Sequence, residues 1–90
     1  MANNVVLMSA DLTSTWIRMV EEPLVANYTL TAMATGGMVY QGASIEIRQG
    51  AATTHWPLNS PIRLWGVDLS TLEFRSTDQD VRLCVIGNTR

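Results

Sequence analysis

Apolar side chains recur at every second position through most of this 90-residue chain. A period of two is the period of a β-strand, whose successive side chains point to opposite faces of a sheet. No window of eleven residues shows the i, i+3, i+4, i+7 apolar stripe of an amphipathic helix. We therefore predict an all-β chain that forms a single domain over residues 1–90.

Candidate strands follow from this alternation and from the turn residues between them. The predicted strands are Asn4–Met8, Thr15–Glu21, Leu24–Thr35, Met38–Gln41 continuing through a bulge at Gly42 into Ala43–Gln49, Thr53–Trp56, Ile62–Val67, Leu72–Ser76 and Val81–Ile86. The predicted turns and loops are Asp11–Ser14, a hairpin at Gly36-Gly37, Gly50–Ala52, Pro57–Pro61, a tight turn at Asp68–Ser70 and a hairpin loop at Thr77–Asp80. About eight short strands in a short chain predict a small antiparallel β-sandwich or a jelly-roll-like barrel.

The inward side of each predicted strand supplies the expected core. Those residues are Ile17, Met19, Leu30, Ile45, Ile47, Leu64, Leu72, Phe74, Leu83 and Val85. A domain of this size gains little net stability from its own core, and this chain has no disulfide or metal site to add to it. We therefore expect contacts between subunits. Residues 1–14 are expected to form an extended N-terminal arm, in which Asn4–Met8 would add a strand to a neighbour.

Charge and composition exclude several classes of function. The net charge is −2 and all six basic residues are Arg, so we expect no nucleic-acid partner and no lysine-based chemistry. No apolar stretch approaches the roughly 20 residues of a membrane-spanning helix, so we expect no membrane partner. The N-terminus has no secretory signal pattern, which predicts synthesis in a reducing cytoplasm.

Candidate catalytic groups are few. His55 is the only histidine and Cys84 the only cysteine, and 29 positions separate them. Neither stands in a nucleophile motif, and Cys84 lies in an apolar run that predicts simple packing. The acidic pair Asp78 and Asp80 lacks the glycine and distal glutamate of a calcium loop. We predict no enzymatic activity, no catalytic residue, no cofactor and no metal.

Tryptophan and arginine give the one positive functional signal. Trp16 and Trp65 alternate with apolar neighbours and should point outward, and Trp56 stands in a third strand. Arg18 and Arg63 each lie two residues from one of these tryptophans, so each pair shares a face. Exposed Trp and Arg are typical of protein interfaces. The candidate interface residues are Trp16, Arg18, Trp56, Arg63 and Trp65.

Two segments carry a resemblance to a known class of protein. The segment WPLNSPIRLWGVDLSTLEFR (residues 56–75) and the closing VRLCVIG (residues 81–87) resemble small β-sandwich virion proteins of tailed bacteriophages. The resemblance implies a head decoration, or cement, protein that sits on the capsid surface as a homotrimer and clamps the major capsid protein. It would be assembled in the host cytoplasm. A small neck, tail or fibre component is the alternative within the same class.

A second class of function is carbohydrate binding, as in a receptor-recognition module. Aromatic side chains on an outer sheet face can stack on sugar rings. This hypothesis requires Trp16, Trp56 and Trp65 to form a coplanar row on one exposed face.

Overall fold

The structure is a computed structural model that describes residues 4–36, 42–77 and 79–89. These residues form seven strands and one short 3-10 turn, with no α-helix. The elements are β1 (Asn4–Leu12), β2 (Val25–Ala34), β3 (Ser44–Gln49), β4 (Ala52–Pro57), β5 (Ile62–Asp68), η1 (Leu69–Thr71), β6 (Glu73–Arg75) and β7 (Val81–Thr89). The predicted strand at Met38–Gln41 lies outside the described residues.

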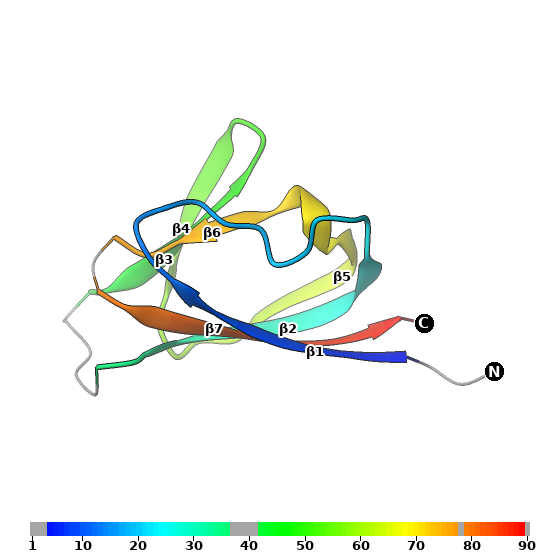
Figure 1. The fold of residues 1–90 in the computed structure, drawn as a ribbon, viewed down its shortest axis with the longest axis horizontal. Coiled ribbons are helices and arrows are strands. Elements are labelled where there is room, and N and C mark those ends of the chain that lie inside the picture. The colour runs from blue at the N-terminus through cyan, green and yellow to red at the C-terminus, as the bar shows by residue number, and fades with distance from the viewer. Residues whose placement is uncertain (1–3, 37–41, 78, 90) are drawn as a thin grey trace.

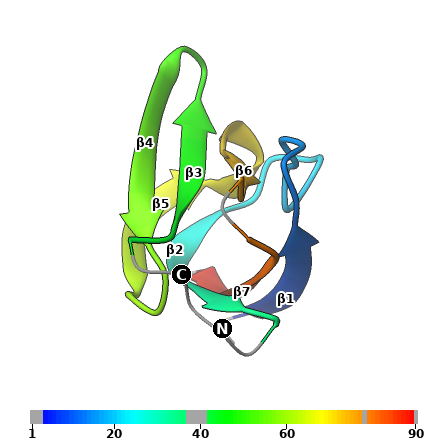
Figure 2. The same cartoon turned by 90° about the vertical axis from the view of Figure 1, so that its left-hand side faces the viewer.

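Two antiparallel sheets face each other, as Figures 1 and 2 show. One sheet has four strands in the order β1-β7-β2-β5, and the other has three in the order β4-β3-β6. The C-terminal strand β7 lies between β1 and β2 and pairs antiparallel with both. This arrangement confirms the predicted all-β sandwich.

The N-terminal segment belongs to the four-stranded sheet. Strand β1 pairs with β7 in an uninterrupted register from Asn4–Thr89 to Leu12–Val81. Residues 4–12 were expected to be part of a free arm, but the chain's own β7 occupies one edge of this strand. The strand also continues past its predicted end at Met8, because Ala10 and Leu12 keep the inward side of the alternation while Asp11 points outward.

One predicted strand is wrong. Residues 15–21 form a loop between β1 and β2 that touches the three-stranded sheet at a single bridge, Ile17 to Phe74. The two backbone hydrogen bonds of this bridge measure 3.0 and 2.8 Å. The alternation of this segment is real, since Ile17 and Met19 pack against the core. The strand it could pair with, β6, is only three residues long, so the ladder does not extend.

The turn predictions succeed where consecutive strands share a sheet. The Gly50 turn joins β3 and β4 into a hairpin, and Gly50 takes a φ of 57°. Strands β2 and β3, and likewise β6 and β7, lie in different sheets, so the loop predicted at Thr77–Asp80 does not join two strands of one hairpin. The hairpin predicted at Gly36-Gly37 with Met38–Gln41 lies outside the described residues. Asp68 caps η1 by accepting a hydrogen bond from the Ser70 N–H at 3.0 Å.

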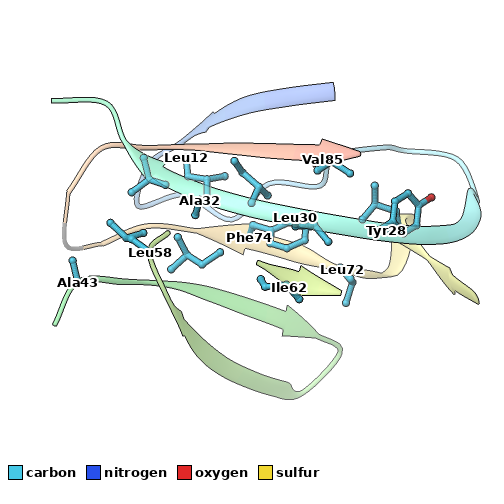
Figure 3. Close-up of a cluster of buried hydrophobic side chains, with 14 of the residues drawn as sticks. Leu12, Tyr28, Leu30, Ala32, Ala43, Leu58, Ile62, Leu72, Phe74 and Val85 are labelled. Carbon is cyan, nitrogen blue, oxygen red and sulfur yellow. The ribbon is translucent and has the colours of Figure 1, made fainter. Parts of the chain in front are cut away.

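The core fills the space between the sheets (Figure 3). Six of the ten predicted core residues are buried, and these are Leu30, Ile45, Leu72, Phe74, Leu83 and Val85. The other four, Ile17, Met19, Ile47 and Leu64, pack against that core but remain partly exposed. The prediction missed further fully enclosed residues, which include Leu12, Leu69 and Val81.

Gly87 leaves room for the Tyr28 ring to lie against β7, an inner strand of the four-stranded sheet. It lies opposite Tyr28 in the register of β2 and β7. A Cβ atom at Gly87 would stand 2.6 and 2.7 Å from two ring carbons of Tyr28, well inside van der Waals contact. The buried Tyr28 hydroxyl donates a hydrogen bond to the Leu24 carbonyl, and burial raises the pKa of this phenol. Glycine at this position is therefore required by the ring.

Candidate functional site

The three tryptophans lie in three different environments. Trp16 comes from the β1–β2 loop, Trp56 from β4 and Trp65 from β5. Trp16 and Trp56 are half-buried, whereas 74% of Trp65 is exposed. The coplanar exposed row that a carbohydrate-binding face requires is therefore not formed.

Trp16 covers the outer face of the three-stranded sheet. Its ring lies between two guanidinium groups, with the Cζ of Arg48 at 4.3 Å and that of Arg75 at 4.4 Å from the ring centroid. Both distances are within the range of a cation–π interaction. Both arginines point away from the core, since they alternate with Ile47 on β3 and Phe74 on β6. Trp16 is thus engaged within the chain.

Each of these arginines is also paired with a carboxylate across the sheet. Arg48 Nη2 lies 2.9 Å from Glu73 Oε1, and Arg75 Nε lies 2.7 Å from Glu46 Oε2. The register of β3 and β6 places each pair directly opposite. The hydrogen bond from Arg75 lowers the pKa of Glu46, against the opposing effect of burial. The Trp16 surroundings therefore form a closed network of rings and charges.

His55 and Arg18 lie at the margins of this network. His55 Nε2 is 3.6 Å from Glu46 Oε1, and its side chain is 68% exposed. Arg18 is exposed and lines a surface hollow together with Trp16, Glu21 and Glu73. Trp16 and Arg18 thus lie on one surface, as predicted. The Trp16 ring, however, contacts Arg48 and Arg75 of the same chain.

Trp56 faces inward. It lies opposite Ile45, which is fully buried, and it packs against the core. Its indole N–H donates a 2.9 Å hydrogen bond to the Ser60 carbonyl. Its ring, together with Leu30 and Phe74, also lines an apolar cavity of about 210 Å³ between the sheets. Internal contacts thus engage the Trp56 side chain, and its role at an interface stays a prediction.

A bulge in β5 accounts for the exposure of Trp65. The register of β2 and β5 shifts between Ala26 and Tyr28, so that Trp65 and Gly66 together stand opposite Asn27. Gly66 takes a φ of 62° and its N–H donates a 2.7 Å hydrogen bond to Asn27 Oδ1. Arg63 and Trp65 project on the outer side, two residues apart, as predicted. The bulge returns Val67 to the core side.

Apolar side chains of β1 and β7 lie on the same outer face of the four-stranded sheet as this tryptophan. Val5 and Ile86 line a shallow hollow of about 440 Å³ with Arg63 and Trp65, and Leu7 stands directly opposite Ile86. Val5, Leu7 and Ile86 are 63%, 71% and 58% exposed. We call the surface formed by Val5, Leu7, Arg63, Trp65 and Ile86 the Trp65 face.

The polar groups of this surface are incompletely paired. Asn88 lines the same hollow, and its Oδ1 atom is buried with no hydrogen-bond partner among the described residues. The described part of the chain also offers the Arg63 side chain no ion pair within 4.0 Å. An unpaired buried oxygen carries an energetic cost.

The candidate catalytic residues are not brought together. Cys84 lies on the outer face of β7, between Ser9 and Thr31, whereas His55 lies on the outer face of the other sheet. Among residues 4–36, 42–77 and 79–89, no three His, Cys, Asp or Glu side chains gather to hold a metal ion. Asp78 of the predicted acidic pair lies outside these ranges. The same residues contain no helix that could cross a membrane.

Comparison of the chain with protein-family models, with curated proteins and with solved structures finds no match. The resemblance to phage virion proteins therefore remains a prediction from the sequence.

Proposed function

We propose that this chain is a structural binding protein whose Trp65 face attaches it to a partner protein. The observation that carries the proposal is the exposure of Trp65 on the same side of the sheet as the exposed Val5, Leu7 and Ile86, with Val5 and Ile86 lining the same hollow. Exposed apolar patches that contain Trp and Arg are typical of protein interfaces. The Arg63 guanidinium, which has no ion pair within the described residues, supplies a polar group that a partner would satisfy.

The sequence resemblance gives this role a specific form. We propose a phage head decoration protein that clamps the major capsid protein on the virion surface. Many copies of a small rigid sandwich, each bound with modest affinity, would together stabilise a shell through avidity. In this role the chain acts by binding and performs no catalysis.

Reconstitution on capsid shells tests this role. Shells assembled from the major capsid protein, without this chain, are mixed with the purified protein and sedimented. Wild-type protein is expected to cosediment and to raise the temperature at which the shells open. Trp65→Ala and Arg63→Glu are expected to stay in the supernatant. Arg18→Ala, which changes an exposed arginine of the β1–β2 loop, is expected to bind as wild type.

Three outcomes would contradict the proposal at different levels. Wild-type protein that fails to bind shells, but is recovered with purified tails, would move it to the neck, tail or fibre. Equal loss of binding by Arg18→Ala and Arg63→Glu would show that the Trp65 face is not the docking surface. Glycan-array binding that Trp65→Ala abolishes, without shell binding, would favour a receptor-recognition module.

A further inference from the structure

Strand β1 has the sequence of a strand covered on both sides, yet it lies at the edge of the sheet. Its residues Val5-Val6-Leu7-Met8 are four consecutive apolar side chains. Continuous apolar runs are typical of strands buried on both faces, whereas a half-covered strand alternates. In the described part of the chain, the β1 backbone pairs with β7 alone. Figure 2 shows β1 at the margin of its sheet, on the side away from β5.

The other edge strands carry devices that discourage pairing with another chain. Strand β5 contains the Gly66 bulge and follows Pro61. Strand β4 ends in Pro57 and exposes threonines and His55. Strand β6 has only three residues, and Ile17 bridges its outer side. From residue 4 to residue 10, β1 has no proline, no charge and no break in register.

Both faces of β1 keep apolar surface that a further strand would cover. Val5 and Leu7 point outward and are 63% and 71% exposed. Val6 and Met8 point toward the core but remain only partly buried, and within the described residues no strand flanks them on the outer edge. A strand added alongside β1 would cover all four side chains at once and would satisfy its free backbone groups.

We infer that this strand is β1 of a second copy, paired antiparallel about a two-fold axis near Val6 and Leu7. A two-fold axis matches one surface with itself, so the same apolar run meets on both sides. The only charged side chain of β1 is Asp11, which pairs with Arg82 at 3.0 Å. An axis near Val6 and Leu7 keeps the two Asp11 carboxylates at opposite ends of the pair, whereas an axis nearer Asp11 would oppose them.

The pairing joins two four-stranded sheets into one continuous sheet. It predicts a dimer, in contrast to the homotrimer that the sequence resemblance implies. The two Trp65 faces would lie on the same side of the joined sheet, since antiparallel pairing keeps outward residues on one side. The inference stands on the β1 edge and does not depend on what the Trp65 face binds.

Sedimentation velocity of the full chain, from low micromolar to sub-millimolar concentration, tests the pairing. Wild-type protein is expected at the mass of two chains, and Val5→Lys with Leu7→Lys at the mass of one. Val25→Lys is the matched control, because Val25 has 58% exposure on the same sheet but lies on β2, two strands away. A wild-type monomer at every concentration, a trimer, or equal dissociation by Val25→Lys would overturn the inference.

Cysteine cross-linking locates the axis and does not require a disruptive variant. Single cysteines at positions 5, 6, 7 and 8, each with Cys84→Ser, are oxidised under mild conditions. Directly opposed antiparallel residues have Cα atoms about 4.5–5.5 Å apart, which suits a disulfide. Cross-linked dimers are expected at position 6 or 7 and not at position 8. Absence of cross-links at both, or equal cross-linking at all four, would contradict the pairing.

The same set of proteins separates this inference from the proposed function. Trp65→Ala is expected to remain dimeric while it loses shell binding. The β1 variants are expected to be monomeric, and only their mass is compared, because Val5 and Leu7 belong to both the β1 edge and the Trp65 face. A dimer that Trp65→Ala dissociates would overturn the β1 pairing, and shell binding by that variant would overturn only the docking role.

Discussion

A tryptophan lies on the outer face of each sheet, but only one of the two has partners within the described part of the chain. On the three-stranded sheet, Trp16 lies between Arg48 and Arg75, and each arginine has its own carboxylate. On the four-stranded sheet, Trp65 is 74% exposed and the neighbouring Arg63 has no described ion pair. The same two residue types therefore complete an internal network on one face and remain available on the other.

This contrast shows what makes an aromatic side chain an interface candidate. Outward direction alone does not, because Trp16 also lies on an outer face. The difference is whether the chain supplies partners for the ring. A loop folds Trp16 onto charged cross-strand pairs, whereas the bulge at Gly66 presents Trp65 with no covering segment among the described residues. Only the second arrangement leaves a ring for another molecule.

The largest loss of stability is expected for a substitution in the core between the two sheets. Leu83→Ala, on β7, should lower the free energy of unfolding by about 2–5 kcal/mol, because Leu83 is fully buried and the truncation leaves a cavity. Ile47→Ala, on β3, should cost less, because Ile47 is only partly buried. Urea unfolding of both variants checks the ranking. A larger loss for Ile47→Ala would show that the three-stranded sheet carries more of the core than its burial indicates.

Removal of the Trp16 ring is expected to cause the next largest loss of stability. Trp16→Ala should lower the free energy of unfolding by about 1–2 kcal/mol, since each cation–π contact contributes about 0.5–1 kcal/mol. Urea unfolding measures this loss. In an Arg48→Gln background the same change should cost less, because one contact is already absent. An equal cost in both backgrounds would show that Arg48 does not hold the ring.

Acid should weaken the network around Trp16, because it contains the Glu46 carboxylate. The pKa of Glu46 lies below its ordinary value, so the folded state favours the ionised carboxylate. This stabilisation is present above the ordinary pKa and is lost as pH falls through the lower, folded-state pKa. Thermal melting of Glu46→Gln between pH 7 and pH 3 should therefore show a smaller decrease than wild type. Glu22→Gln, in the exposed β1–β2 loop, should follow wild type.

The exposed Trp65 ring should contribute least to the free energy of unfolding. Trp65→Ala is expected to change the free energy of unfolding by less than about 0.5 kcal/mol, as is usual for surface substitutions without internal partners. Urea unfolding beside Trp16→Ala makes the comparison direct. A loss as large as that of Trp16→Ala would mean that Trp65 supports the sandwich, and the contrast between the two faces would fail.

Alternation in the sequence identified most of the strands and the side that each buries. It placed Leu30, Ile45 and Leu83 on the inward side of their strands, and all three are buried. It failed where pairing depends on a distant segment. The segment at residues 15–21 alternates as a strand does, but only Ile17 finds a backbone partner.

The sequence also does not indicate which of the two sheets each strand joins. Glycine pairs predict a reversal of the chain but not whether the chain returns to the same sheet or crosses to the other. The site predictions share this limit. Alternation correctly turned Arg63 and Trp65 outward, but the enclosure of Trp16 depends on Arg48 and Arg75, which lie 32 and 59 positions further along the chain. Nothing near Trp16 in the sequence indicates these partners.

Because the three indole rings have different surroundings, tryptophan fluorescence can report on binding at Trp65. Trp65 is open to water and to a dissolved quencher such as acrylamide, while Trp56 is shielded by the core and Trp16 by two guanidinium groups. A molecule that settles over Trp65 would protect one fluorophore and leave the other two unchanged. Docking can then be followed by quenching of the unlabelled protein, and a Trp65→Phe variant, which lacks the responsive emitter, provides the blank.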